Sequence, residues 1–131
     1  MSTRDLRNGE TSPCFSVLSA LIIFAIGALG GLTLAGVYVL QGKLASWVLS
    51  LLHAALGAIG LLVLLYAALT SGIPGAALAA LVILAMAALG GFYLASIHLR
   101  GQVAKKSTVF IHAGVAVIGF PTLLGAVLNF S

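Results

Sequence analysis

Charge is the first thing that this sequence lacks. Only 6% of its 131 residues are charged, and no Asp or Glu follows Glu10. Hydrophobic residues make up 62% of the chain, whereas a soluble domain has about 45–50% apolar and about 25% charged residues. Polar side chains are too few to cover a surface in water, which excludes a soluble enzyme, a nucleic-acid-binding module and a disordered chain. Lipid must therefore surround most of this protein.

Several chemical groups are missing as well. The single cysteine, Cys14, excludes an internal disulfide and any CxxC metal or redox motif. Four-span multidrug exporters have a similar size but depend on an acid inside the membrane, so the lack of acids after Glu10 argues against a transporter. Phosphate-binding loops, Ser/His/Asp arrangements and paired carboxylates are also absent, and nothing supports hydrolysis or phosphoryl transfer.

Long uncharged stretches predict four membrane spans. About 20 apolar residues suffice to cross a bilayer, and Leu and Ala dominate these stretches without the period-two alternation of a membrane barrel. We therefore predict an all-α membrane protein, a four-helix bundle that follows a polar tail at 1–14. The expected transmembrane helices are 15–40, 47–69, 76–99 and 108–129.

The chain contains an internal repeat. Residues 18–40 placed over 78–100, an offset of 60, match at 11 of 23 positions, and chance in such an Ala/Leu-rich helix gives about 15–20%. With an offset of 59 the match continues, and His53 then falls on His112. We expect two tandem helical hairpins, 15–70 and 76–131, related by a pseudo-two-fold axis along the membrane normal.

Lysine and arginine placement predicts the orientation. Lys43 lies between the first two spans, and Arg100, Lys105 and Lys106 lie between the last two, so four positive residues share one side. The other side has two arginines and both acids of the chain. The positive-inside rule favours cytoplasmic basic loops, with both termini outside, in a bacterial inner membrane.

The paired histidines are the candidate site. His53 and His112 enter the second and fourth spans from the same side, so the pseudo-two-fold axis places two imidazoles facing each other at one depth. Neutral imidazole is a good iron ligand, and a haem with two axial histidines needs them opposed with a flat slot between. No carboxylate or thiolate accompanies them at membrane depth, which weakens zinc, copper or non-haem iron as candidates.

Glycines lie at the same depth on the two spans that carry no histidine. These are Gly30 and Gly31 in the first span and Gly90 and Gly91 in the third. This arrangement resembles the four-helix haem bundle of membrane b-type cytochromes. The resemblance implies one haem b with His53 and His112 as axial ligands, and with the four glycines making room for the porphyrin.

The chain departs from that family in one respect. The family's ligand helices carry a second histidine near the opposite membrane face, where this sequence has Ala67 and Ala126. One haem is therefore the most that we expect. His98, at the end of the third span, is a candidate for bonding a haem propionate or a quinol hydroxyl, or is simply an interfacial polar residue. Arg100, and with it Lys105 and Lys106, can pair with the haem propionates or serve only as topology charges.

Two functions follow from these patterns. The first is a cytochrome b-like electron-transfer protein, more an electron-transfer subunit than a stand-alone enzyme, which is linked to quinol or anchors a redox partner subunit in the bilayer. The alternative is a cofactor-free structural or accessory membrane protein. Small-residue faces are ordinary helix contacts in membranes, and a histidine near a helix end can simply bond a backbone carbonyl or interfacial water.

Overall fold

The computed structural model describes residues 12–129 and shows four helices. They are α1 (Pro13–Gln41), α2 (Trp47–Thr70), α3 (Gly75–Leu99) and α4 (Lys106–Leu128). Every predicted span is confirmed to within two residues at each end. All four helices are long and apolar enough to cross a membrane, so the chain is an all-α, four-helix integral membrane protein.

The helix starts differ most from the predicted bounds. α1 begins at Pro13, with Ser12 as its N-cap, as the fixed φ of proline favours at the first helical position. Pro13 and Cys14 therefore belong to the helix and not to the tail predicted at 1–14, while residues 1–11 lie outside the described part of the chain. α4 begins at Lys106, two residues before its predicted start, because Lys105 is the last extended residue of the loop.

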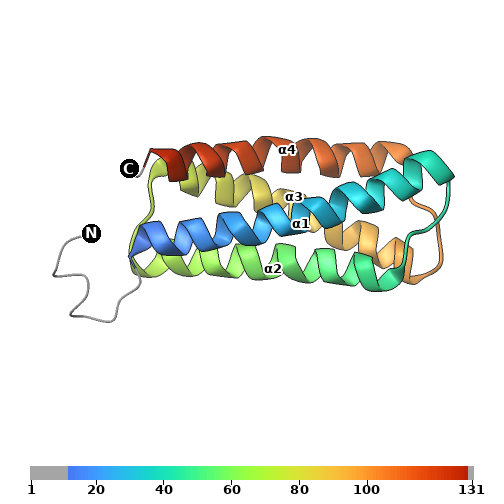
Figure 1. Cartoon of the computed structure of the whole chain (residues 1–131), viewed down its shortest axis with the longest axis horizontal. Coiled ribbons are helices and arrows are strands. Elements are labelled where there is room, and N and C mark those ends of the chain that lie inside the picture. Colours follow the sequence, from blue (N-terminus) through green and yellow to red (C-terminus); the bar gives the residue numbers. More distant parts are fainter. Residues whose placement is uncertain (1–11, 130–131) are drawn as a thin grey trace.

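The four helices form a ring of neighbours. α1 packs mainly on α2 and α3 mainly on α4, as two hairpins, while α2–α3 and α1–α4 contacts close the ring. The pairs α1–α3 and α2–α4 thus lie across its diagonals. Figure 1 shows the connections α1–α2 and α3–α4 together at one end of the bundle, here called the loop end. The α2–α3 connection and the last turn of α4 lie at the other end, here called the terminal end.

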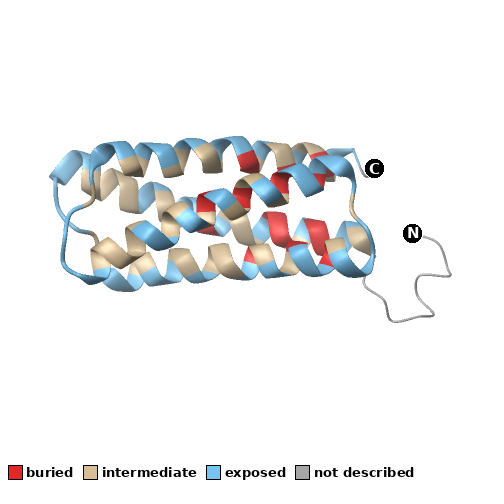
Figure 2. Cartoon of the chain, turned by 180° about the vertical axis from the view of Figure 1, so that it is seen from behind, coloured by how far each residue is buried: buried red, intermediate tan, exposed pale blue. Residues whose placement is uncertain are grey.

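The tightly packed core occupies only half of the bundle. Figure 2 shows the buried residues gathered toward the terminal end, and none near the loop end. The largest fully buried side chains are Leu64, Leu123 and Val17. Alanines and glycines let the helices approach closely there, as is usual in membrane bundles. The buried apolar side chains are Val17, Ala20, Leu21, Leu64, Ala67, Ala77, Ala80, Leu84, Ala87, Leu123 and Ala126.

The repeat seen in the sequence recurs in the packing of this core. A Cβ on Gly60 would lie 2.9 Å from the ring of Phe24, and one on Gly119 would lie 2.8 Å from Leu84. Gly60 and Gly119 are repeat counterparts, and so are Phe24 and Leu84. Each hairpin therefore locks its two helices together at the same register, with a large side chain of the first helix against a glycine of the second.

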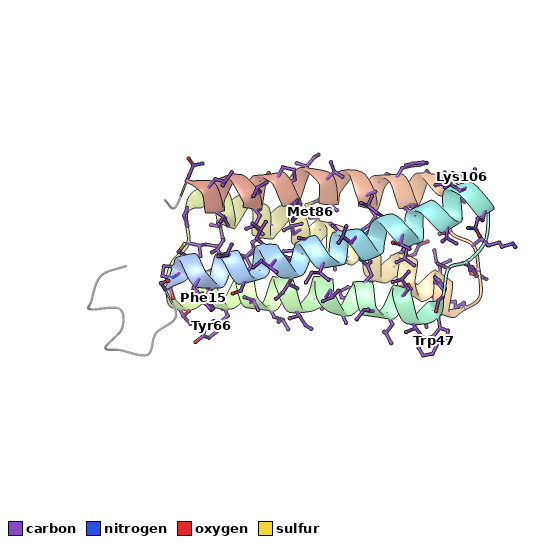
Figure 3. All side chains as sticks on the ribbon, viewed as in Figure 1. Phe15, Trp47, Tyr66, Met86 and Lys106 are labelled. Carbon is purple, nitrogen blue, oxygen red and sulfur yellow. The ribbon has the colours of Figure 1, made fainter. Side chains whose placement is uncertain are left out.

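Apolar side chains cover the outside of the bundle. Leu40, Leu32 and Leu89 are each at least 70% exposed, which water would not favour but lipid does. Figure 3 places Trp47 and Lys106 at the loop end, and Phe15 and Tyr66 at the terminal end. Trp and Tyr are enriched where a membrane meets water, so the two ends match the two interfaces.

Candidate functional site

The two histidines lie at the same depth in the bundle. His53 and His112 are each the seventh residue of their helix, because α2 begins at Trp47 and α4 at Lys106. Six residues at 1.5 Å place both about 9 Å from the loop end of the helices. The early start of α4 thus gives the two hairpins equal spacing, and the equal depth predicted from the repeat is confirmed.

Each imidazole donates a hydrogen bond to a backbone carbonyl of its own hairpin. The Nδ1–H of His53 donates to the carbonyl oxygen of Gly27 at 2.8 Å, and the Nδ1–H of His112 donates to that of Ala87, also at 2.8 Å. A carbonyl oxygen can only accept, so Nδ1 carries the proton in both rings. In a neutral imidazole of this tautomer, Nε2 keeps an unshared lone pair, which is the form in which histidine binds metals.

The two rings also lie close to each other across a diagonal of the bundle, in an edge-to-face arrangement. Their centroids are 6.1 Å apart, and their planes are nearly perpendicular, at 86°. The sequence predicted this approach of His53 and His112, and the structure confirms it. Two hydrogen-bonded imidazoles with free Nε2 atoms therefore lie side by side inside the membrane region.

Glycines give these rings their space. A Cβ on Gly31 would lie 2.8 Å from Cε1 of His53, and one on Gly91 would lie 3.0 Å from Cε1 of His112. Gly30 and Gly90 face the histidines less closely, with Cβ distances of 3.8 and 3.7 Å to the Cβ of His53 and of His112. The double glycines therefore accommodate the imidazole of their own hairpin, and their predicted role toward a porphyrin stays a prediction.

A cavity of about 400 Å³ lies between the four helices, and both histidines line it. Its floor, toward the terminal end, is apolar and includes Phe24, Leu84 and Phe120. Small side chains line the walls at the histidine level. These are Ala28, Gly31, Ala35, Ala54, Gly57, Ala58, Ala88, Gly91, Ala95, Ala113 and Ala116.

The mouth of the cavity at the loop end is polar. Tyr38, Lys43, His98 and Gln102 line it, and the hydroxyl of Tyr38 donates to the carbonyl of Ala104. That bond joins the end of the first hairpin to the loop of the second. The cavity is consequently amphipathic: below the level of the two histidines its lining is apolar, and its other polar groups lie toward the loop end.

Of the other two predicted site residues, only His98 lines the cavity. His98 lines the cavity, and it also lines a shallow surface pocket beside Leu44 and Trp47. Arg100 is exposed and is not among the residues that line the cavity. Lys43, which the sequence suggested only as a topology charge, is the one Lys or Arg of residues 12–129 that lines it.

Metal ions that need three or more protein ligands find no site here. Across residues 12–129, no group of three His, Cys, Asp or Glu side chains is placed to hold one ion. Two histidines alone suffice only where the remaining ligands come from elsewhere, as they do for iron in a porphyrin.

Two features of the site had no signal in the sequence. The carbonyls of Gly27 and Ala87 belong to the backbone, which every residue shares, so only the fold selects them as acceptors. Nothing in the sequence distinguishes Lys43 from the other loop lysines, and only the folded loop brings it to the cavity.

No known protein family, curated protein or solved structure matches the chain.

Proposed function

We propose that this chain is a small membrane cytochrome of b type that holds one haem between His53 and His112 and transfers electrons. The observation that carries the proposal is the pair of matched Nδ1–H hydrogen bonds, at 2.8 Å in both hairpins. Such a bond to a second group orients a ligating histidine and sets its tautomer. Here it leaves both Nε2 atoms free to bind the same iron.

The separation of the rings fits this group. Two imidazole nitrogens on one metal are roughly 4 Å apart, because each bond is about 2 Å long. A conjugated five-membered ring with bonds of about 1.33 Å adds about 1.1 Å from each nitrogen to its ring centroid. With both Nε2 atoms on the line that joins the rings, the expected centroid separation is about 6.2 Å, close to the 6.1 Å between His53 and His112.

In this proposal the protein holds the haem and shields it from water. The carbonyls of Gly27 and Ala87 orient the two ligand rings, and the apolar cavity wall keeps water away from them. A haem held by both His53 and His112 would supply a one-electron carrier, with no position left for oxygen to bind. The arrangement thus suits electron transfer and not oxygen chemistry.

The terminal end supports a single haem and not two. Ala67 and Ala126, at the positions where the resembled family carries its second histidine pair, are 0% and 2% exposed. Ala126 belongs to the tightly packed core with Leu64 and Leu123, and Ala67 is fully buried as well, so a macrocycle has no space there. The chain alone would therefore move electrons at one side of the membrane.

The charge pattern supports a membrane side for this centre. By the positive-inside rule, the loop end with Lys43, Arg100, Lys105 and Lys106 lies in the cytoplasm of a bacterium, and both termini lie outside. The haem would then lie in the inner-membrane leaflet that faces the cytoplasm. Its electrons would come from quinol in the bilayer or pass to a redox partner subunit that this chain anchors.

A visible spectrum of the protein tests the proposal. The full chain, expressed with ample haem and purified in mild detergent, should carry one non-covalent b-type haem that is low-spin in both redox states. His53→Ala and His112→Ala should each abolish haem retention. His98→Ala should retain the haem and serves as the matched control, because His98 lies at the cavity mouth. A colourless wild-type preparation would refute the proposal.

A cofactor-free accessory protein is the second candidate. Each imidazole already has a carbonyl partner, and a centroid distance of 6.1 Å also falls within the roughly 4.5–7 Å range of ordinary aromatic contacts. In that case His53→Ala and His112→Ala would lower the stability of a colourless protein. The spectrum and the two variants therefore separate the two candidates.

A further inference from the structure

We propose that Lys43 is the anion-binding group of the cavity and receives a carboxylate of the bound cofactor at the loop end. This inference rests on the proposed function and deepens it, since it sets the direction in which an amphipathic macrocycle enters. It also replaces the cations that the sequence suggested, because Lys43 lines the cavity whereas Arg100, Lys105 and Lys106 do not.

The cavity itself dictates the direction. Its floor is formed by apolar side chains such as Phe24 and Phe120, and beyond them Leu64 and Leu123 are fully buried. An ionised carboxylate has no hydrogen-bond donor there and would lose its hydration, which costs several kilocalories per mole or more. Carboxylates of a cavity ligand must therefore face the loop end, where the lining is polar.

Local backbone geometry brings Lys43 to that mouth. Gly42 has a φ of 61°, and its N–H bonds to the carbonyl of Tyr38, which is the left-handed termination that glycine permits at a helix end. The chain therefore leaves α1 sharply, and the next residue lies over the cavity. Lys43 is exposed and also lines the cavity, as a long side chain can when it lies between an apolar wall and water.

The mouth is also where the two repeats differ. At the offset of 60, Val103 is the counterpart of Lys43, and His98 is the counterpart of Tyr38. The first repeat thus brings a lysine to the mouth, while the second repeat brings His98 and Gln102. The two histidines are therefore surrounded symmetrically by the two repeats, whereas the proposed anion site at the mouth belongs to the first repeat alone.

A comparison of two ligands tests this inference. The full chain is purified from haem-starved cells and titrated with haem, and separately with haem dimethyl ester, which lacks free carboxylates. Three proteins are compared: the wild type, Lys43→Gln and Lys105→Gln. Lys105 is an exposed loop lysine that does not line the cavity, so its variant removes the same charge from the same end of the bundle.

The expected result is a loss of affinity for only one combination of protein and ligand, Lys43→Gln with haem. Lys43→Gln should weaken haem binding about threefold to tenfold, as for a partly solvated ion pair, and should leave binding of the ester unchanged. Lys105→Gln should change neither. Equal weakening of both ligands by Lys43→Gln, or no weakening at all, would overturn the role of Lys43 while leaving the haem proposal intact. If neither ligand gives a histidine-ligated spectrum with the wild type, the proposed function itself fails, and this inference fails with it.

Discussion

A methyl group added at Gly31 tests the contact on which the site depends. The Cβ of Gly31→Ala would lie 2.8 Å from Cε1 of His53 and 3.3 Å from its Nδ1. Ordinary contact begins at 3.4 Å, so the ring must move by 3.4 − 2.8 = 0.6 Å. The hydrogen bond from Nδ1 to Gly27 is 2.8 Å long and cannot survive such a shift unchanged.

The energy follows from three contributions. Weakening a partly buried hydrogen bond costs about 1 kcal/mol, and overpacking costs about 1–3 kcal/mol. Alanine in a helix returns up to about 1 kcal/mol relative to glycine. We therefore expect Gly31→Ala to lower the free energy of unfolding by about 1–3 kcal/mol and to lower the amount of haem retained, because the displaced ring no longer presents Nε2 at its original position.

Other glycines supply a graded series of controls. Gly36→Ala, in the same helix, would meet nothing within 4 Å, and Gly30→Ala would meet His53 only at ordinary contact distances, 3.8 Å to its Cβ and 4.0 Å to its Nδ1. Both should retain haem and should be as stable as the wild type or slightly more so. Gly91→Ala, with a closest distance of 3.0 Å, should fall between Gly36→Ala and Gly31→Ala.

Thermal unfolding in detergent and the haem-to-protein ratio from the absorption spectrum measure the whole series. The reasoning would be refuted if Gly31→Ala matched Gly36→Ala in both measurements. It would also be refuted if all four alanine variants lost haem equally, because the effect would then not follow the distance to the histidine ring.

The remaining predictions concern topology and the core. A reporter fused after Ser131 should appear on the outer face of the membrane, and activity of a cytoplasmic reporter there would reverse the proposed orientation. Leu64→Ala, at a fully buried position, should lower the unfolding free energy in detergent by about 1–3 kcal/mol, since the cavity cost remains even where lipid cancels much of the transfer cost. Leu62→Ala, at a position 65% exposed to the surroundings, should change it little; an equal loss in the two variants would contradict the position of the core.

The fold was largely predictable from the sequence alone. A backbone in lipid must satisfy its own hydrogen bonds, and uninterrupted apolar stretches longer than a bilayer can do so only as helices. Polar residues such as Lys43 and Arg100 interrupt those stretches, so the four spans could be located to within two residues. The repeat then related His53 to His112, and equal spacing in two parallel hairpins predicted their equal depth.

Only the tertiary structure decided what surrounds the two histidines. Hydrogen bonding to Gly27 and Ala87 depends on how closely α1 approaches α2 and α3 approaches α4, and no side chain marks a backbone acceptor in advance. Gly31 and Gly91 contact the imidazole of their own hairpin in addition to lining the cavity, because helix rotation within a hairpin decides which neighbour a small residue meets. The loop end is likewise a tertiary matter: Lys43 and Arg100 carry the same charge in similar loops, but the turn at Gly42 brings only Lys43 to the cavity.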